Sequence, residues 1–290
     1  MTAPGTIDKC VGVPKNFLNY LLYHNVCPEY HEQIENARKL CDKAREELAA
    51  IVQVQPLLPG DFNTACSEVF GGQYHGLHNP ASEVWMSEKD KEQWTIGLPA
   101  EKARKIFKIG FAAYATDSQI ALYNTQAKKK AIQTIREMEV DLEIIGITPG
   151  HSIPETSTLY QHELGSDHFV LGKMSARAWR NPAIGEEDLI EGDKSSRPEV
   201  GTVFEFWMED HIMEKFLIGM KLEATVRELS FGIHHFDNIH AVKCSFANFL
   251  ANEMMLEWKK IEDEWLPPRP KNESGAQEED EVDDSIKDDE

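Results

Sequence analysis

Apolar and polar residues alternate most clearly in the C-terminal half of the chain, between Gly201 and Phe246. There the apolar Met220, Leu222, Ala224 and Val226 are separated by the polar Lys221, Glu223, Thr225 and Arg227. A period of two residues is typical of a half-buried antiparallel strand. Residues 231–242 form a second run after a short gap, which predicts a hairpin with Gly232 near its turn. Residues 202–206 predict a third strand.

The N-terminal half instead repeats its apolar residues at helical spacing. Pro14 suits the first turn of a helix that we expect to end near His24. A second, longer helix is predicted from Pro28. Its apolar residues form an uninterrupted heptad seam at Tyr30, Ile34, Ala37, Cys41, Ala44, Leu48 and Ile51. Such a seam either packs on the chain's own helices or binds a partner helix, and both interpretations stay open at this point.

Three more helices are predicted further along. The first is capped by Asp61 and ends at Gly71-Gly72, the second follows Pro99, and the third covers residues 120–142 at a period of about 3.7 residues. Residues 73–98 predict a long irregular loop, which in a compact domain is usually functional or mobile. Residues 142–147 and 169–174 predict further strands, and residues 248–266 a final helix.

Together these elements predict an α+β fold, in which a layer of long antiparallel helices packs on a mostly antiparallel sheet. The expected organisation has a flexible N-terminus at 1–13 and one domain at 14–268. Within that domain the helical part spans 14–142 and the β-rich part 143–268. Residues 269–290 are acidic and poor in apolar side chains, which predicts a disordered tail.

The formal net charge of −20 argues against a protein that grips a phosphate backbone over a broad surface. One compact basic cluster, Lys128-Lys129-Lys130 with Arg136 nearby, is either a solvated helix face or a contact for RNA phosphates. The five cysteines are scattered and form no C-x-x-C pair, which indicates reduced thiols. We therefore expect a protein of the nucleus and cytoplasm, with no membrane segment.

Motifs for catalysis are few. Ser152 lies in Gly150–Pro154, which is similar to a nucleophile elbow but lacks its second glycine. The histidines of 234–240 could bind a metal, but strand parity puts His234 and His240 on one face with Asn238, and His235 with Asp237 on the other. Two histidines are fewer than the three ligands of a catalytic zinc, and nothing in the sequence brings His75 and His78 of the loop to this strand. We therefore predict no catalytic residue, metal or cofactor.

Several long strings resemble one family. They are FLNYLLYHNVCPEYHEQIENARKLCDKAREELAAI (17–51), DFNTACSEVFGG (61–72), FEFWMEDHIMEKF (204–216), GMKLEATVRELSFG (219–232), VKCSF (242–246) and NEMMLEWKKIEDEWLPP (252–268). Together they resemble the Argonaute-binding subunit of the fungal Argonaute siRNA chaperone complex (Argonaute-binding protein one). The resemblance covers most of residues 14–268.

The resemblance implies a non-enzymatic subunit whose partners are Argonaute and a second chaperone subunit, without a small-molecule substrate. Such proteins bind Argonaute that holds duplex siRNA, so that RNA is contacted indirectly, and restrain slicing or passenger-strand release in RNA silencing and heterochromatin formation. The family often has a basic segment upstream, so this chain is expected to be a short isoform or a partial gene model. As partner-binding candidates we take the charged residues Lys128, Lys129, Lys130, Lys221, Glu223 and Arg227.

Three alternatives remain from the residues themselves. A serine hydrolase would use Ser152, a metal enzyme would use His234 to His240, and a direct RNA-binding module would show a steep salt dependence of its RNA affinity.

Overall fold

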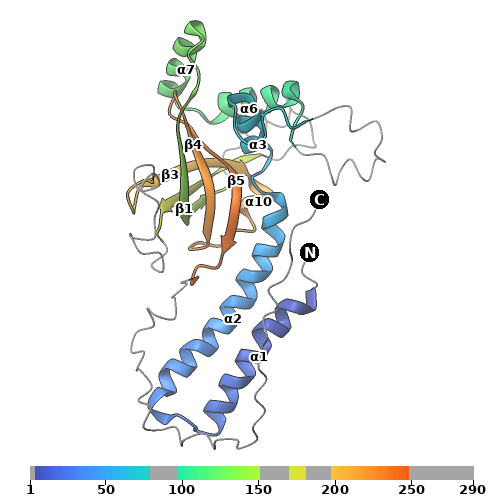
Figure 1. Cartoon of the computed structure of the whole chain (residues 1–290), viewed down its shortest axis with the longest axis vertical. Coiled ribbons are helices and arrows are strands. Elements are labelled where there is room, and N and C mark those ends of the chain that lie inside the picture. The colour runs from blue at the N-terminus through green and yellow to red at the C-terminus, as the bar shows by residue number, and fades with distance from the viewer. Residues whose placement is uncertain (1–3, 79–96, 151–169, 181–196, 248–290) are drawn as a thin grey trace, which may run out of the picture. The chain divides into compact units, whose positions relative to one another are not determined.

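The computed structural model describes residues 4–78, 97–150, 170–180 and 197–247 (Figure 1). Residues 1–249 belong to one compact unit, and all of the described residues lie in it. Its helices are α1 (Pro4–Tyr23), α2 (His31–Val54), α3 (Asp61–Phe70), α6 (Ala100–Tyr114), α7 (Asp117–Lys129) and the short α10 (Asp210–Met213), with 3-10 turns at Pro28–Tyr30 and Gln55–Leu57. None of the helices in the described ranges combines the length and the apolar character needed to cross a membrane.

The strands among the described residues form an antiparallel sheet with the order β3-β2-β1-β4-β5. They are β1 (Thr134–Thr148), β2 (Leu171–Ala178), β3 (Val203–Glu209), β4 (Lys221–Leu229) and β5 (His234–Lys243). The predicted hairpin is confirmed as β4 and β5, and Gly232 lies at its turn with a φ of 82°. Helices in the N-terminal part and a C-terminal antiparallel sheet confirm the predicted α+β fold.

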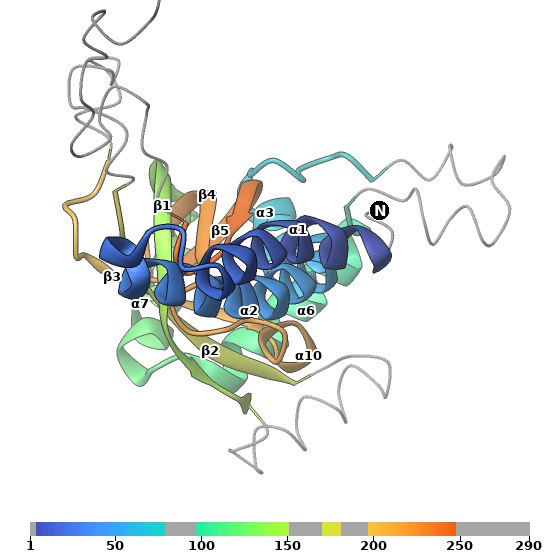
Figure 2. The same ribbon diagram turned by 90° about the horizontal axis from the view of Figure 1, so that it is seen from below.

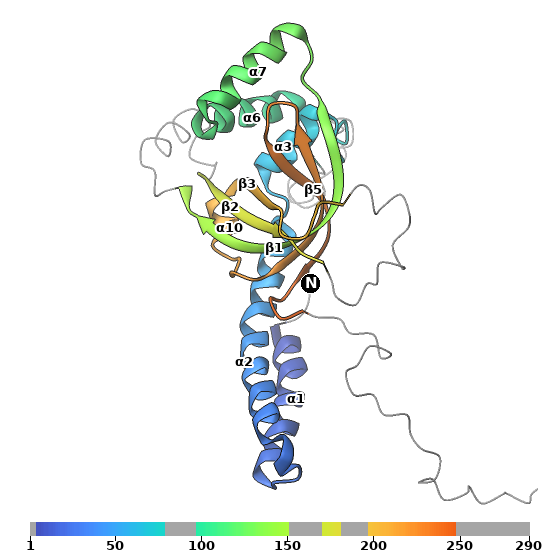
Figure 3. The same ribbon diagram turned by 90° about the vertical axis from the view of Figure 1, so that its left-hand side faces the viewer.

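The sheet curls until its two edge strands meet (Figure 3). The rings of Phe206 on β3 and Phe236 on β5 lie 5.1 Å apart, and those of Phe204 and His234 lie 5.3 Å apart. These side chains belong to the inner side of the curl, where the apolar residues of all five strands gather around the end of α2. The inner residues include Met138, Val140, Leu142, Met174, Phe204, Phe206, Leu222, Val226 and Phe236.

A buried asparagine of α3 bridges the two edge strands, β3 and β5. The amide nitrogen of Asn63 donates to the carbonyl oxygens of Trp207 (3.0 Å) and Pro59 (3.1 Å), and the backbone N–H of Phe236 donates to its amide oxygen (3.3 Å). Asn63 thus replaces the ladder hydrogen bonds that two edge strands cannot make at this point. A second apolar cluster, formed by α3, α6 and the β4–β5 turn around Phe62, Phe107 and Phe231, covers this end of the sheet.

The carboxyl group of Glu209 fixes the first turn of α3 to the end of β3. Its Oε1 accepts a hydrogen bond from the backbone N–H of Phe62 (2.7 Å), which is one of the free donors at a helix N-terminus. Burial raises the pKa of Glu209 to about 7, although the backbone N–H groups of this turn oppose that rise. Gly60 is required beside it, since a Cβ there would lie 2.3 Å from Glu209 Oε2.

α1 and α2 lie side by side, as Figure 2 shows from below, and they are in contact. Ile34 of the heptad seam is buried, and ion pairs join Asp8 to Arg45 (3.1 Å) and Lys15 to Asp42. Ile51, at the other end of the seam, is buried in the core of the sheet. This supports the interpretation that the seam is internal. α1 lies along the middle of the seam, whereas Tyr30 at its start is 55% exposed.

Two predicted boundaries are wrong. The first helix begins at Pro4 and not at Pro14, so residues 4–13 are not loose: Val11 is buried and Asp8 binds Arg45, which holds the extra turns in place. The helix predicted to reach Leu142 ends at Lys129, and β1 begins at Thr134.

The second error has a physical cause. The four-residue spacing between Met138 and Leu142 fits a helix, but it also fits the period of a strand. Pairing with β4 decides between them, since Met138 lies opposite Val226 and Leu142 opposite Leu222. Tertiary contacts here override a local helical pattern.

Candidate protein interaction surface

The predicted contact residues of β4 lie together on the polar face of the sheet, but each is held by other residues of the chain. Lys221 is only 7% exposed; its Nζ donates to the carbonyl oxygen of Ser245 and lies 4.5 Å from the centre of the Trp179 ring. Burial lowers the pKa of Lys221. This side chain therefore supports the end of β5.

The other two predicted residues of β4 belong to a network of charges. Glu223 binds Lys243 at 2.9 Å, and Arg227 donates through Nε to Asp237 (3.2 Å) and forms an ion pair with Glu137. Glu223 and Arg227 are thus paired with opposite charges on neighbouring strands, which leaves little unpaired charge at these positions for a partner.

Two carboxyl groups approach one another in this network. Burial raises the pKa of Asp141 to about 6, and the neighbouring Glu223 adds to the rise, while Arg197 at 3.7 Å opposes it. Burial would also raise the pKa of Glu223, but the hydrogen bond and charge of Lys243 lower it overall. The cavity beside them, of about 300 Å³, is lined by charged groups that bind each other, which is the environment of a structural ion network.

The histidines of β5 do not share the face that strand parity predicts. His234 lies against Phe204 on the apolar side, whereas His240 binds Glu139 at 2.9 Å on the polar side. The cause is an irregular register of β4 and β5 next to Asn238, whose φ is +40°. An inserted residue of this kind shifts the side chains that follow to the other face. The prediction that His234 and His240 lie on one face is therefore wrong.

The start of the long loop does reach β5, but through Asp237 and not through histidines. Asp237 accepts hydrogen bonds from Ser67 Oγ (2.5 Å) and the backbone N–H of Gln73 (2.8 Å). His75 instead contacts the carbonyl oxygen of Glu68, and burial lowers the pKa of His235 to about 4. In the ranges that the structure describes, no three His, Cys, Asp or Glu side chains are placed to hold a metal ion. Ser152 lies outside those ranges.

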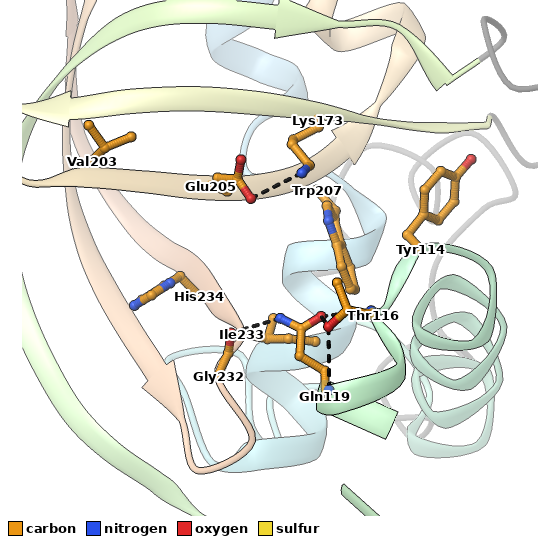
Figure 4. A pocket seen from close by; sticks show the side chains of 10 residues that line it. All are labelled: Tyr114, Thr116, Gln119, Lys173, Val203, Glu205, Trp207, Gly232, Ile233 and His234. Carbon is orange, nitrogen blue, oxygen red and sulfur yellow. Dashed lines mark hydrogen bonds and ion pairs between the residues drawn. The ribbon is translucent and has the colours of Figure 1, made fainter. Parts of the chain in front are cut away.

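A small pocket opens where the turn between α6 and α7 faces β3 and the β4–β5 turn (Figure 4). It has a volume of about 240 Å³, and Trp207 and Tyr114 line it from one side. Several of its polar groups already have partners: Lys173 binds Glu205 at 3.0 Å, and Gln119 donates to the carbonyl oxygen of Gly232 at 2.9 Å. The pocket is large enough to receive a side chain.

The lysines at Lys128–Lys130 lie exposed at the C-terminal end of α7. Lys128 and Lys129 occupy its last turn, where positive charge is favourable, and Lys130 ends the helix with a φ of 53°. Because the helix stops here, the three lysines stand at a turn and do not continue along a helix face. Their side chains are accessible to a partner.

Among the described residues, exposed large apolar side chains are most numerous on α1, α2 and the turn between them. Of fourteen large apolar side chains exposed among the described residues, seven are in this segment: Val13, Phe17, Tyr20, Tyr23, Val26, Tyr30 and Leu40. Phe17 is 60% exposed and Tyr23 86%. Concentrated exposure of this kind marks a site of protein interaction, whereas single exposed apolar residues are ordinary.

Sequence reasoning missed this surface although its signal is present. Cys10, Val13, Phe17 and Tyr20 follow one another at spacings of three, four and three residues, which is a second heptad stripe on α1. Placing the helix start at Pro14 removed Cys10 and Val13 from the helix. Within the shorter helix the sequence groups Phe17 with Leu18, Leu21 and Leu22 as one apolar face. The structure separates them, since Phe17 is 60% exposed and the three leucines are partly buried.

A comparison with known families gives the identity of the chain. Residues 1–261 match the family described as Argonaute siRNA chaperone (ARC) complex subunit Arb1. No curated protein and no solved structure matches the chain. The match spans most of the 290 residues, including all the helices and strands described above. The chain therefore belongs to the family of the Arb1 subunit of the Argonaute siRNA chaperone complex.

Proposed function

We propose that this protein is a non-enzymatic subunit that binds Argonaute carrying duplex siRNA, together with a second subunit of the chaperone complex. In this role it restrains slicing and release of the passenger strand, and so acts in RNA silencing and heterochromatin formation. The family match over residues 1–261 is the observation that carries this proposal. We place this function in the nucleus and the cytoplasm.

The physical features of the chain agree with a binding role. Its exposed apolar side chains gather on a pair of helices, which suits contact with another protein. The charged residues of the sheet are engaged with each other, and the net charge of −20 is unfavourable for holding a nucleic acid over a wide area. The main contact with siRNA is thus proposed to be made through Argonaute. An additional direct contact of this chain with the siRNA phosphates would be made by the exposed Lys128–Lys130.

The test is a binding and slicing assay with purified proteins. Argonaute is prepared empty, with duplex siRNA and with the guide strand alone, and each form is mixed with the purified chain and the second subunit. We expect a complex with duplex-loaded Argonaute that survives nuclease treatment, and slower release of a labelled passenger strand when the complex is present. Equal release with and without the chain, or no association with any form of Argonaute at low salt, would contradict the proposal.

A further inference from the structure

The outward surface of α1 is the most unusual feature of the helical pair, because it is apolar and almost free of charge. We define the α1 stripe as Cys10, Val13, Phe17 and Tyr20, all of which are exposed. They occupy a face of α1 different from the one that carries Val11 and packs on α2. The helix therefore has two apolar faces, of which α2 covers one.

The second apolar face of α1 has few charged side chains near it that would favour exposure to water. Of the three charged residues of α1, Asp8 and Lys15 bind Arg45 and Asp42 of α2, and Lys9 is the third. From Cys10 to Tyr23, Lys15 is the only charged residue of the helix. In a chain with 28% charged residues, a solvent-facing helix surface would normally carry several charges.

The geometry points to one kind of occupant: an amphipathic α-helix of another subunit of the Argonaute chaperone complex, packed along the α1 stripe. This inference rests on the proposed function. A heptad stripe is matched by the apolar side of a second helix, which would extend the pair of α1 and α2 to three helices. RNA does not fit, since the stripe offers no Lys or Arg for phosphates.

The net charge of the chain favours a different protein over a second copy of this chain. Two copies would bring together net charges of −20 each, and like charges oppose association. Phe17 and Tyr20 of the stripe are 60% and 55% exposed, and Tyr23, which lies beside the stripe at the end of α1, is 86% exposed. With Val13 they offer roughly 500 Å² of apolar area, which is the larger part of the ~800 Å² that one partner contributes to a standard interface.

The inference is tested with the double variant Phe17→Glu and Tyr20→Glu. Glutamate is a good helix former and both positions are exposed, so the fold of α1 is expected to be retained, as checked by circular dichroism. The matched control is Leu122→Glu with Ile135→Glu, which are 49% and 54% exposed in another part of the chain. Dissociation constants are measured for purified duplex-loaded Argonaute and, separately, for the purified second subunit.

We expect the α1 variant to bind one of these two proteins at least tenfold more weakly, and the control to bind within about twofold of the wild type. Unchanged binding of the α1 variant to both proteins would overturn the inference and leave the proposed function intact. If the wild type binds neither protein, both fail together.

Two further measurements identify the occupant. A photo-cross-linking amino acid at Val13 in the purified complex is expected to react with one helical segment of a partner subunit. Cross-links confined to the chain itself would overturn the assignment. Light scattering of the wild type is expected to give a monomer, and a dimer that the double variant dissociates would show that a second copy occupies the stripe.

Discussion

Replacing Asn63 by leucine tests whether one amide closes the curled sheet. Asn63 is fully buried and contacts Trp207 on one edge strand and Phe236 on the other. Leucine has a similar size but can neither donate nor accept a hydrogen bond. The substitution would leave the carbonyl oxygen of Trp207 and the N–H of Phe236 without their hydrogen-bond partner at the buried junction of β3 and β5.

The expected loss of stability follows from these two groups. A buried polar group that loses its partner costs about 1–3 kcal/mol, so the pair costs about 4 kcal/mol. Leucine is the better helix former by roughly 0.5 kcal/mol, which offsets a small part. We therefore expect the free energy of unfolding to fall by about 3 kcal/mol, which lowers the melting temperature by roughly 6–12 °C in a domain of this size.

Two measurements check this prediction. Urea denaturation gives the change in free energy, with Asn124→Leu on the exposed surface of α7 as the control, which should stay within about 0.5 kcal/mol of the wild type. Hydrogen exchange reports the junction itself, since the amide of Phe236 should exchange faster in the Asn63 variant. A loss below about 1 kcal/mol with the Phe236 amide still protected would refute the role given to Asn63.

Three other predictions concern pH, packing and charge. The pKa of Glu209, raised by burial to about 7 from an ordinary 4.5, means that the native state holds the proton more tightly. Stability should therefore fall by about 3 kcal/mol as the pH rises through this range, and Glu209→Gln should remove that part of the slope in urea titrations; an unchanged slope would contradict it. Gly72→Ala would place a Cβ 2.3 Å from Asp237 Oδ2 and should lower the melting temperature by several degrees, whereas Gly146→Ala, whose Cβ has ordinary contacts, should not. Reversing the charges at Lys128–Lys130 should weaken binding to duplex-loaded Argonaute at low salt more than at high salt; equal loss at both would exclude a phosphate contact.

The strands that alternate strictly could be predicted from the sequence. Met220, Leu222, Ala224 and Val226 point into the core because a period of two residues leaves one face to bury. The start of β1 could not be predicted, because the spacing of Met138 and Leu142 fits both a helix and a strand. Only the pairing with β4 decides between the two. The bulge near Asn238 could not be predicted either, since no Gly or Pro marks it and the register of β5 depends on its partner strand β4.

The exposed apolar surface of α1 could not be predicted because of a preference of proline for the start of a helix. A proline in the first turn of a helix is common, and this made Pro14 an attractive start. Buried Val11 and the pair of Asp8 with Arg45 extend the helix past it, and only then do Cys10 and Val13 join Phe17 in a stripe. The role of Asn63 was beyond sequence reasoning altogether, because it exists only once the sheet has curled.

Buried acidic residues connect the helices to the sheet and to neighbouring segments, and so help to hold α1 and α2, with the α1 stripe, in place. Glu47 of α2 is 2% exposed and accepts hydrogen bonds from the backbone N–H (2.6 Å) and the hydroxyl (2.7 Å) of Ser245 beyond β5. Glu209 binds the first turn of α3 in the same manner, and Asp237 binds the backbone after it. A buried carboxyl group that loses its hydrogen-bond donors costs free energy, so each of these three contacts opposes a movement of the elements that it connects. Ile51 and Val54 in the core of the sheet hold the C-terminal end of α2, and α1 packs on α2 through the buried Val11, with ion pairs beside it. A partner that binds the α1 stripe therefore meets a surface already in place, which reduces the entropy lost on binding.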